Sequence, residues 1–363
     1  MTKNNDKRIV VTRTLDAEGG EFGINSNDGR LLNLMMICCE ENPPYGPAIG
    51  TANNFLELIC LAYKRYITLT RNSGKQLLTT SNITISITVF HAQTLDYPSD
   101  NEEWDSFTGI IIPGSLSTAY HDHIEWIERL QKVIREEINI NRRKTLAVCF
   151  GHQSFAHAFK DYSSNRLNRN QDKGEPQRGL AVKCPTGCKV GRRSCNLTIE
   201  GKWFLSSALA SVATFESLEL LYTHGDMVQS LPPIAISLGG NDSVPVLAAA
   251  YFKSEEYAAR FRENAIVNYE GSKTIPSSGS LEEYTKLNGY SSLPYAITLQ
   301  AHPEYIANDG LTFMNTSAHV QEVGHVTESE ATTACEDAKK NFDRFLQDSL
   351  DTMIAIGITL QWF

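Results

Sequence analysis

Long hydrophobic runs are missing from this sequence. No apolar stretch approaches the ~18 to 20 residues that a helix needs to cross a bilayer, and candidates such as residues 31–39 and 353–360 are much shorter. The polar first residues are not followed by an apolar core long enough for a secretory signal peptide. We therefore expect a cytoplasmic protein that makes no contact with a membrane.

The sequence is also poor in cysteine, and it carries no excess of positive charge. Eight cysteines in 363 residues are too few for a disulfide scaffold. Cys184, Cys188 and Cys195 lie close together, but they lack a C-x-x-C pair and a nearby histidine, so we predict no metal site. A net charge of −9 argues against a surface that binds nucleic acid. Small molecules or other proteins are the expected partners.

What the sequence does contain is a repeated alternation of strand-like and helix-like segments. Near-continuous apolar or β-branched residues predict strands, and apolar residues at helical spacing predict helices between them. The expected strands are residues 31–39, 83–90, 107–113 and 146–148, and the expected helices include residues 55–63 and 124–138. This order predicts an α/β fold with a mostly parallel central sheet and helices on both faces.

The remaining segments suggest how the domain is bounded. Residues 1–30 are polar and predict an N-terminal extension, residues 31–318 the main domain, and residues 319–363 a C-terminal helical extension packed on it. Residues 160–183 and 268–292 read as surface insertions. Further strands are expected at residues 217–223, 244–252 and 295–301, and a helix at residues 331–354.

The segment "LAVCFGHQSFAHAF", residues 146–159, places Cys149 between a short strand and a helix. A side chain on such a sharp turn is exposed at the edge of the sheet, and Gly151 removes a side chain that would crowd it. The amino terminus of a helix also favours a thiolate. The position indicates a reactive cysteine, although a structural cysteine at a strand end is equally compatible with this stretch alone.

A second segment supplies a base that could act with this cysteine. In "YAITLQAHPEY", residues 295–305, an apolar strand leads into His302 and Glu304. In an extended chain the two side chains project to the same side. Glu304 could then orient the imidazole while His302 takes the thiol proton, which completes a triad with Cys149.

Four motifs together resemble those of class I glutamine amidotransferases. They are "IIIPGS" at 110–115, "CFGHQ" at 149–153, "HGDMV" at 224–228 and "HPEY" at 302–305, in the order of that family. The resemblance spans residues 31 to 305 and implies a flavodoxin-like fold. It implies that Cys149 is the nucleophile, His302 the general base and acid, and Glu304 the third member of the triad.

The same resemblance assigns further roles. The backbone N–H groups of Gly114 and Phe150 would form the oxyanion hole. Gln153, His224 and Asp226 would hold the glutamine, although the last two could instead form a capping pair within a loop. We interpret His152 and His157, on the same predicted helix as Phe150, as structural histidines.

Three functions remain open from the sequence. The first is hydrolysis of a γ-glutamyl amide, most simply glutamine to glutamate and ammonia, through a γ-glutamyl thioester. The second is a γ-glutamyl peptidase with a larger leaving amine, and the third is a non-catalytic or partner-dependent regulatory subunit. No P-loop or dinucleotide fingerprint occurs, so we expect no cofactor. The partners implied are glutamine or another γ-glutamyl compound and, for an ammonia donor, a separate synthetase.

Overall fold

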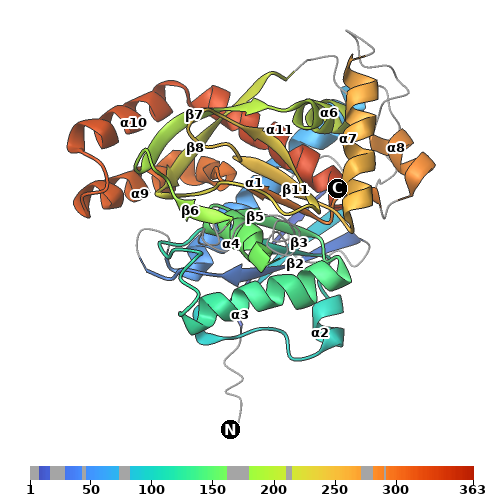
Figure 1. The fold of residues 1–363 in the computed structure, drawn as a ribbon, viewed down its shortest axis with the longest axis horizontal. Helices are drawn as coiled ribbons and strands as arrows, with labels where there is room; N and C mark the ends of the chain where they lie inside the picture. Colours follow the sequence, from blue (N-terminus) through green and yellow to red (C-terminus); the bar gives the residue numbers. More distant parts are fainter. Residues whose placement is uncertain are drawn as a thin grey trace, which may run out of the picture.

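A large mixed sheet forms the centre of the molecule (Figure 1). The computed structural model describes residues 8–16, 29–42, 46–72, 82–161, 180–209, 215–270, 281–289 and 292–363. Among these residues, the sheet has ten strands in the order β1-β3-β2-β4-β5-β12-β11-β10-β7-β8. The described part of the chain contains no helix that combines the length and the apolarity needed to cross a membrane.

The middle of the sheet is parallel. Its strands are β3 (Asn82–His91), β2 (Gly29–Cys38), β4 (Gly109–Ile112), β5 (Thr145–Val148) and β12 (Ala296–Leu299). Alternate residues of β2 enter two different cores: Leu34 and Met36 belong to one, and Met35 and Ile37 to the other. The near-continuous apolar runs therefore arise because both faces of these strands are covered.

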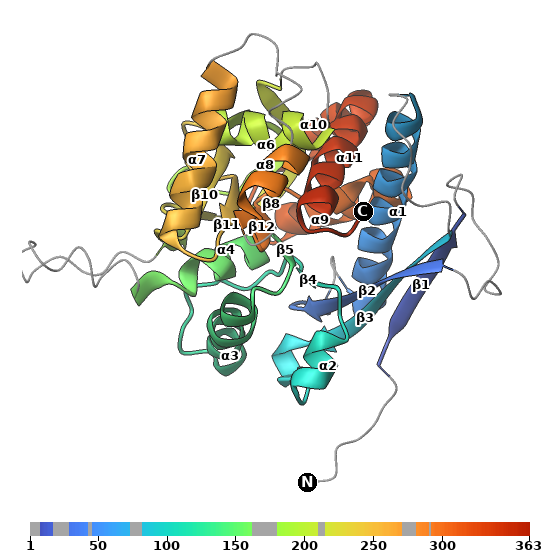
Figure 2. The same ribbon diagram turned by 90° about the vertical axis from the view of Figure 1, so that its right-hand side faces the viewer.

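Helices cover each face of this parallel part (Figure 2). One face carries α1 (Ala48–Asn72) and α11 (Phe342–Thr359), which pack against each other. The other face carries α3 (Glu125–Val133), which continues as a π-helical segment η2 (Ile134–Asn139), and α4 (Phe150–His157). The short α2 (Asn101–Asp105) lies on the same side as α3. The expected α/β fold with helices on both faces is confirmed.

The other part of the sheet is antiparallel and curls back on itself. It contains β11 (Ala248–Tyr251), β10 (Ala235–Gly240), β7 (Lys189–Leu197) and β8 (Ser217–His224). The backbone N–H of His302, just beyond β12, donates to the carbonyl of Leu221 on β8 at 2.9 Å. The last strand of the sheet therefore returns to the end of β12, although it lies four positions away in strand order.

Several helices and two short strands accompany the antiparallel part. The strands β6 (Ala181–Lys183) and β9 (Asp226–Val228) pair with each other. The helices are α6 (Ile199–Leu209), α7 (Glu255–Glu270) and α8 (Leu281–Asn288). The sequence interpretation missed β7, β10 and α6, and its strand at 244–252 is shortened to β11.

The predicted N-terminal extension needs correction. Residues 10–15 form β1 (Val10–Leu15), an edge strand antiparallel to β3, and β2 already begins at Gly29. Arg8 fastens the start of β1, because its guanidinium bonds Asp96 at 3.2 Å and also Glu103, and lies 4.0 Å from the centre of the Phe90 ring. Residues 1–7 and 17–28 lie outside the described residues.

The predicted helix at 331–354 is two helices, α10 (Glu328–Lys340) and α11, preceded by α9 (Leu311–Glu322). The break lies at Asn341, whose backbone leaves the helical region and whose amide donates to the Asp337 carbonyl at 3.0 Å. The two predicted insertions are also partly helix or strand, since α7 reaches residue 270, α8 lies within 268–292, and β6 ends at residue 183. Residues 162–179, 271–280 and 290–291 lie outside the described residues.

Candidate active site

The turn between β5 and α4 holds Cys149 in an unusual backbone conformation. Its φ is 53° and its ψ is −109°, a combination that costs an L-residue energy and occurs mostly at functional turns. At Gly151 an added Cβ would lie 2.3 Å from the carbonyl oxygen of Ile112, so only glycine lets α4 approach the end of β4. The predicted strand, cysteine, glycine and helix arrangement is confirmed. The expected exposure of Cys149 is wrong, because the residue is 3% exposed and belongs to the hydrophobic core.

His302 and Glu304 form a tight buried pair at the end of β12. The Nδ1 atom of His302 lies 2.7 Å from Oε1 of Glu304, and the two residues are 0% and 4% exposed. The backbone between them is not extended as expected, because Glu304 lies in the 3₁₀ segment η5 (Pro303–Gly310). The carboxylate nevertheless reaches the imidazole.

Strand pairing brings this pair beside the cysteine. Strands β5 and β12 are parallel neighbours, with Val148 opposite Leu299, so the residues that follow them emerge at the same edge of the sheet. Burial alone would lower the pKa of His302, but the charges of Glu304 and Cys149 and hydrogen bonds to both side chains raise it above its ordinary value of 6.5. Since Glu304 engages Nδ1, Nε2 is the ring atom that can exchange a proton with Cys149.

Two further contacts fix the imidazole. Its ring stacks on Tyr305 with the ring centres 4.2 Å apart and the planes 2° from parallel. The Tyr305 hydroxyl lies 2.9 Å from Oγ1 of Thr223 on β8. The Sγ atom of Cys149 lies 3.8 Å from the carbonyl oxygen of the same Thr223. The curled strand β8 therefore supports both His302 and Cys149.

The two residues expected to supply oxyanion donors follow neighbouring strands. Gly114 is buried in the loop after β4, and Phe150 is the first residue of α4 after β5. The pairing of Ile112 with Ala147 places both loops at one edge of the sheet. The first N–H groups of a helix have no partner within it, so the N–H of Phe150 is available to bind negative charge.

Glu40, which the sequence interpretation missed, holds the loop that follows β4 and contains Gly114. The carboxylate is 5% exposed and follows β2. Its Oε2 accepts from the Ser115 hydroxyl and the Leu116 N–H, both at 3.3 Å, and its Oε1 accepts from the N–H of Asn42 at 3.0 Å. A buried carboxylate is costly unless its oxygens are satisfied. Glu40 therefore ties the loop beside Gly114 to the end of β2.

The three expected substrate-binding residues lie together, and the side chains of Gln153 and His224 both contact the backbone of Asp226. The amide nitrogen of Gln153 donates to the Asp226 carbonyl at 2.9 Å and to Oε1 of Gln300 at 3.1 Å. Nδ1 of His224 lies 2.8 Å from the same Asp226 carbonyl, which matches the loop-capping alternative. Burial lowers the pKa of His224 to about 3, so this imidazole is neutral at physiological pH.

The Asp226 side chain also has a partner within the site. Its Oδ1 accepts from the Tyr120 hydroxyl at 2.9 Å. Burial raises the pKa of Asp226, while hydrogen bonds from Tyr120 and Thr118 oppose that rise. The carboxylate thus lies in a polar but partly desolvated position, where a cationic group of a ligand would be favoured.

A cavity of about 570 Å³ joins these elements, and Cys149, Gln153, His224 and Asp226 all line it. This volume falls within the range of small-molecule sites, about 300 to 1,000 Å³. Part of its wall comes from residues that sequence reasoning did not single out: Tyr120, His121, Lys183, Cys188, Val320 and His325. His325 follows α9, so the C-terminal helical region contributes to the cavity, although no motif marks it.

The two other histidines of α4 have structural contacts. Nδ1 of His152 lies 2.7 Å from Oγ1 of Thr298, and its Nε2 lies 3.2 Å from the Val246 carbonyl. Burial lowers the pKa of His152 to about 4, so this side chain is a neutral link between α4 and the sheet. His157 lies 3.4 Å from Asp122. The interpretation of His152 as structural is confirmed. Among the described residues, no group of three or more His, Cys, Asp or Glu side chains could hold a metal ion.

Comparison with known proteins gives one curated relative. Gamma-glutamyl peptidase 5 of Arabidopsis thaliana is 26% identical over 156 residues, which cover 42% of this chain and 52% of the relative. The match thus spans about half the length of the curated relative. This similarity confirms the resemblance that the motifs indicate. No protein-family profile matches the chain.

Solved structures with a related arrangement are also found. A glutamine amidotransferase from Thermotoga maritima is 12% identical with a TM-score of 0.46, over 88% of this chain and 98% of that one. The glutaminase domain of CTPS from Trypanosoma brucei, solved with bound acivicin, is 12% identical with a TM-score of 0.38, over 79% of this chain and 94% of that one. The α/β fold itself follows from the sheet and helix arrangement of this chain.

Proposed function

We propose that this chain is an enzyme that hydrolyses γ-glutamyl amide bonds, most simply glutamine to glutamate and ammonia. The observation that carries this proposal is the buried pair of His302 and Glu304, 2.7 Å apart, beside a cysteine on a strained turn. The charges of Glu304 and Cys149 that raise the pKa of His302 support a working unit of three residues.

In the first half of the reaction, Nε2 of His302 takes the thiol proton of Cys149. The Sγ atom attacks the γ-carbonyl carbon, and the carbonyl π electrons move to its oxygen. The N–H groups of Gly114 and Phe150 stabilise that negative oxygen. His302 then returns the proton to the leaving nitrogen, so that the C–N bond breaks, the amine departs and a γ-glutamyl thioester remains on Cys149.

In the second half, water takes the place of the amine. His302 removes a proton from the water, the hydroxide oxygen attacks the thioester carbon, and the C–S bond breaks as the proton returns to sulfur. Glutamate is released and the cysteine is restored. Glu304 keeps the imidazole oriented throughout and stabilises its protonated form.

Recognition of the γ-glutamyl group falls to the residues around Asp226. Its carboxylate, which accepts a hydrogen bond from Tyr120, suits the α-ammonium group. Lys183 lies on β6 directly opposite Asp226 on β9 and suits the α-carboxylate. Gln153 and His224 hold the Asp226 backbone and so position this binding group.

A γ-glutamyl peptidase is the second candidate, and the size of the cavity favours it. A volume of about 570 Å³ leaves room beyond a glutamine side chain for a leaving amine larger than ammonia. The name of the curated relative, Gamma-glutamyl peptidase 5, points the same way. An ammonia donor would instead need a synthetase partner, and would hydrolyse glutamine slowly without it.

The test is turnover of glutamine and a panel of γ-glutamyl dipeptides, followed by glutamate and amine release. Cys149→Ala should abolish turnover, and the wild type should carry a γ-glutamyl adduct on Cys149 in rapid-quench mass spectrometry. Cys188→Ala is the matched control, because Cys188 lines the same cavity. Turnover that survives in Cys149→Ala, or is lost equally in Cys188→Ala, would reject the mechanism. A higher kcat/KM for dipeptides than for glutamine would select the peptidase.

A further inference from the structure

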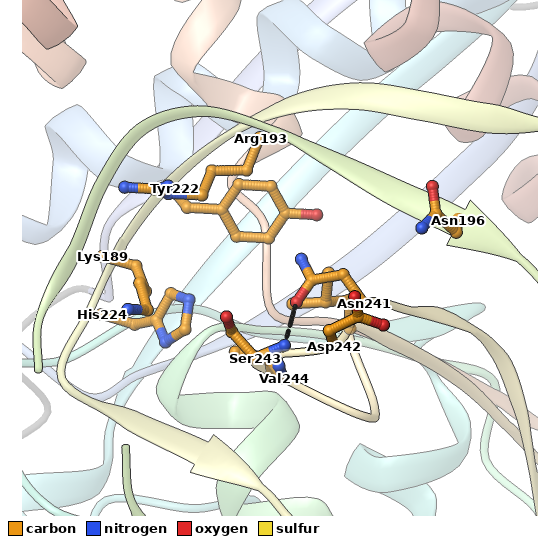
Figure 3. Close-up of a pocket in the computed structure, with 10 residues that line it drawn as sticks. Lys189, Arg193, Asn196, Tyr222, His224, Asn241, Asp242, Ser243 and Val244 are labelled. Carbon is orange, nitrogen blue, oxygen red and sulfur yellow. Dashed lines mark hydrogen bonds between the residues drawn. The ribbon is translucent and has the colours of Figure 1, made fainter. Parts of the chain in front are cut away.

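A second pocket lies next to the active-site cavity, between β7, β8 and the turn that joins β10 to β11 (Figure 3). Its volume is about 250 Å³, below the roughly 300 Å³ at which drug-sized ligand sites begin. A ligand here would be a small metabolite. His224 lines both this pocket and the active-site cavity, so one imidazole separates the two.

One side of the pocket carries positive charge. Lys189 and Arg193, both on β7, line it. Lys189 donates to the carbonyl of Thr186, just before the strand, at 2.9 Å, and Arg193 donates to the carbonyl of Val190 at 3.4 Å. Among the described residues, no carboxylate lies within the 4.0 Å of an ion pair from either side chain. Glu330 interacts with Arg193 through its charge but forms no ion pair with it. Both cations therefore keep N–H donors that can bind an anionic group.

The opposite side carries a carboxylate and a buried hydroxyl. Asp242 is exposed at the rim, away from Lys189 (Figure 3). Tyr222 is 1% exposed, and its hydroxyl, which points toward Asn241, has no hydrogen-bond partner among the described residues. A buried hydroxyl without a partner is costly, so a ligand atom that bonds it would be favoured.

Side-chain hydrogen bonds hold the turn that carries Asp242. The side-chain oxygen of Asn241 accepts from the N–H groups of Ser243 at 3.0 Å and Val244 at 2.9 Å, and its amide nitrogen donates to the Ser194 carbonyl on β7 at 3.2 Å. These bonds fix the turn to β7, the strand that carries Arg193. The distance between the positive and negative sides of the pocket is thus set by the fold.

We propose that this pocket binds a free α-amino acid as a zwitterion. Lys189 and Arg193 hold the carboxylate, whereas Asp242 and the Tyr222 hydroxyl accept hydrogen bonds from the ammonium group. Because His224 forms the shared wall, an amino acid in this pocket lies next to the active site without entering it. The inference goes beyond the proposed hydrolysis, since binding needs no turnover.

The test is calorimetric titration of Cys149→Ala protein with glycine, alanine and glutamate, at constant pH and ionic strength and without glutamine, which is itself an α-amino acid and would compete for the pocket. At least one amino acid should bind about tenfold more tightly than glycolate or ethanolamine, which each lack one of the two charges. The double variant Lys189→Gln/Arg193→Gln should weaken amino-acid binding about tenfold or more. Asp242→Asn should weaken amino-acid binding but leave glycolate binding unchanged.

The charge-matched control is Lys132→Gln/Lys253→Gln, which removes two exposed cations far from the pocket and should bind like the parent. Tyr222→Phe should weaken binding while keeping or raising the Tm, a pair of effects that a purely structural tyrosine would not show. Glycolate binding as tight as any amino acid would identify a simple anion site and overturn the proposal. Absence of saturable binding by all three amino acids would also overturn it. A wild-type protein that binds these amino acids but turns over neither glutamine nor γ-glutamyl dipeptides would count against the proposed hydrolase alone.

Discussion

The parallel and antiparallel parts of the sheet contribute different things to the candidate site. The parallel part ends in the side chains that would react, with Cys149 after β5 and His302 after β12. The antiparallel part surrounds them: β8 contacts Cys149 through the Thr223 carbonyl and His302 through the Leu221 carbonyl, and Asp226 begins β9 just after it. The residues proposed for covalent chemistry therefore follow strands that are buried on both faces. The residues proposed for recognition belong to the antiparallel strands, which form a curled wall around the site.

The difference teaches how rigidity is distributed. The parallel strands are fixed by pairing on two sides and by helices on two faces, which suits groups that must keep their geometry within a fraction of an ångström. The antiparallel strands are joined to the parallel part by the backbone hydrogen bond between His302 and Leu221 and by side-chain bonds such as that of Tyr305 to Thr223. Changes in the first part should alter kcat, and changes in the second should alter KM.

The largest expected effect is that of Cys149→Ala. Turnover should fall by about 10⁴-fold or more, because the members of a triad act as one unit. The protein should stay folded with a modestly lower Tm, because Cys149 is 3% exposed and packs in the core as well as lining the cavity. Steady-state kinetics and thermal unfolding check both statements. An active Cys149→Ala protein would show that the reaction does not depend on the cysteine at the end of the parallel strand β5.

Glu304→Gln should lower kcat by roughly 10²-fold, because orientation of the imidazole is only partly lost. The charge of Glu304 raises the pKa of His302, so the limb of the pH profile that reports His302 should move to lower pH in the variant. Glu322→Gln, an exposed carboxylate on α9, is the control. An unmoved limb would mean that Glu304 does not interact with a titrating His302.

The same pair makes a prediction for stability. The folded-state pKa of His302 is raised above 6.5, so the stabilisation of its protonated form is complete below pH 6.5 and is lost as the pH rises through the folded-state value. The stability difference between wild type and Glu304→Gln should therefore shrink as the pH rises across that range. Chemical denaturation at several pH values measures it, and a difference that grows with pH contradicts the assignment.

Glu40→Gln should lower kcat by about tenfold with a smaller change in KM. The amide cannot accept at both positions, so the hydrogen bonds that hold Ser115 and Leu116 weaken and the loop of Gly114 loses its position. Glu41→Gln is the neighbouring control, with a side chain that is 53% exposed. A change in KM alone would place Glu40 with the recognition wall instead.

The smallest expected effect is that of Asp226→Asn, about a fivefold rise in KM with kcat nearly unchanged. The amide keeps an oxygen for the Tyr120 hydroxyl but loses the charge that would hold an ammonium group. Initial rates over a range of glutamine or γ-glutamyl peptide concentrations separate the two constants. A fall in kcat without a rise in KM would break the division between the two parts of the sheet.

Sequence patterns predict the parallel part well and the antiparallel part poorly. Runs such as 31–39 are apolar throughout because both faces are buried, and this signal is local. Strand β7 contains the polar residues Arg192, Arg193 and Asn196, because one of its sides meets solvent and the other meets α10, so its pattern resembles a loop. The edge strand β1 also contains polar residues. Its pairing with β3 depends on residues 68 to 78 positions away.

The residues of the site show the same contrast between those that sequence motifs predict and those they do not. Cys149, Gly151, His302 and Glu304 lie in short motifs whose geometry follows from the turns that contain them. Glu40 was missed because a single glutamate after a strand carries no pattern, and its role depends on a loop 75 residues further along. His325 and Lys183 line the cavity only because distant helices and strands bring them there.

The positive φ of Cys149 has a consequence for how this chain can change over time. A non-glycine residue in such a conformation costs about 1–3 kcal/mol, and that cost is present whether or not a substrate is bound. Cys149→Gly would relieve this strain but would also remove a side chain that is 3% exposed and packed in the core. A change at this turn therefore trades backbone strain against core packing, and the two terms oppose each other.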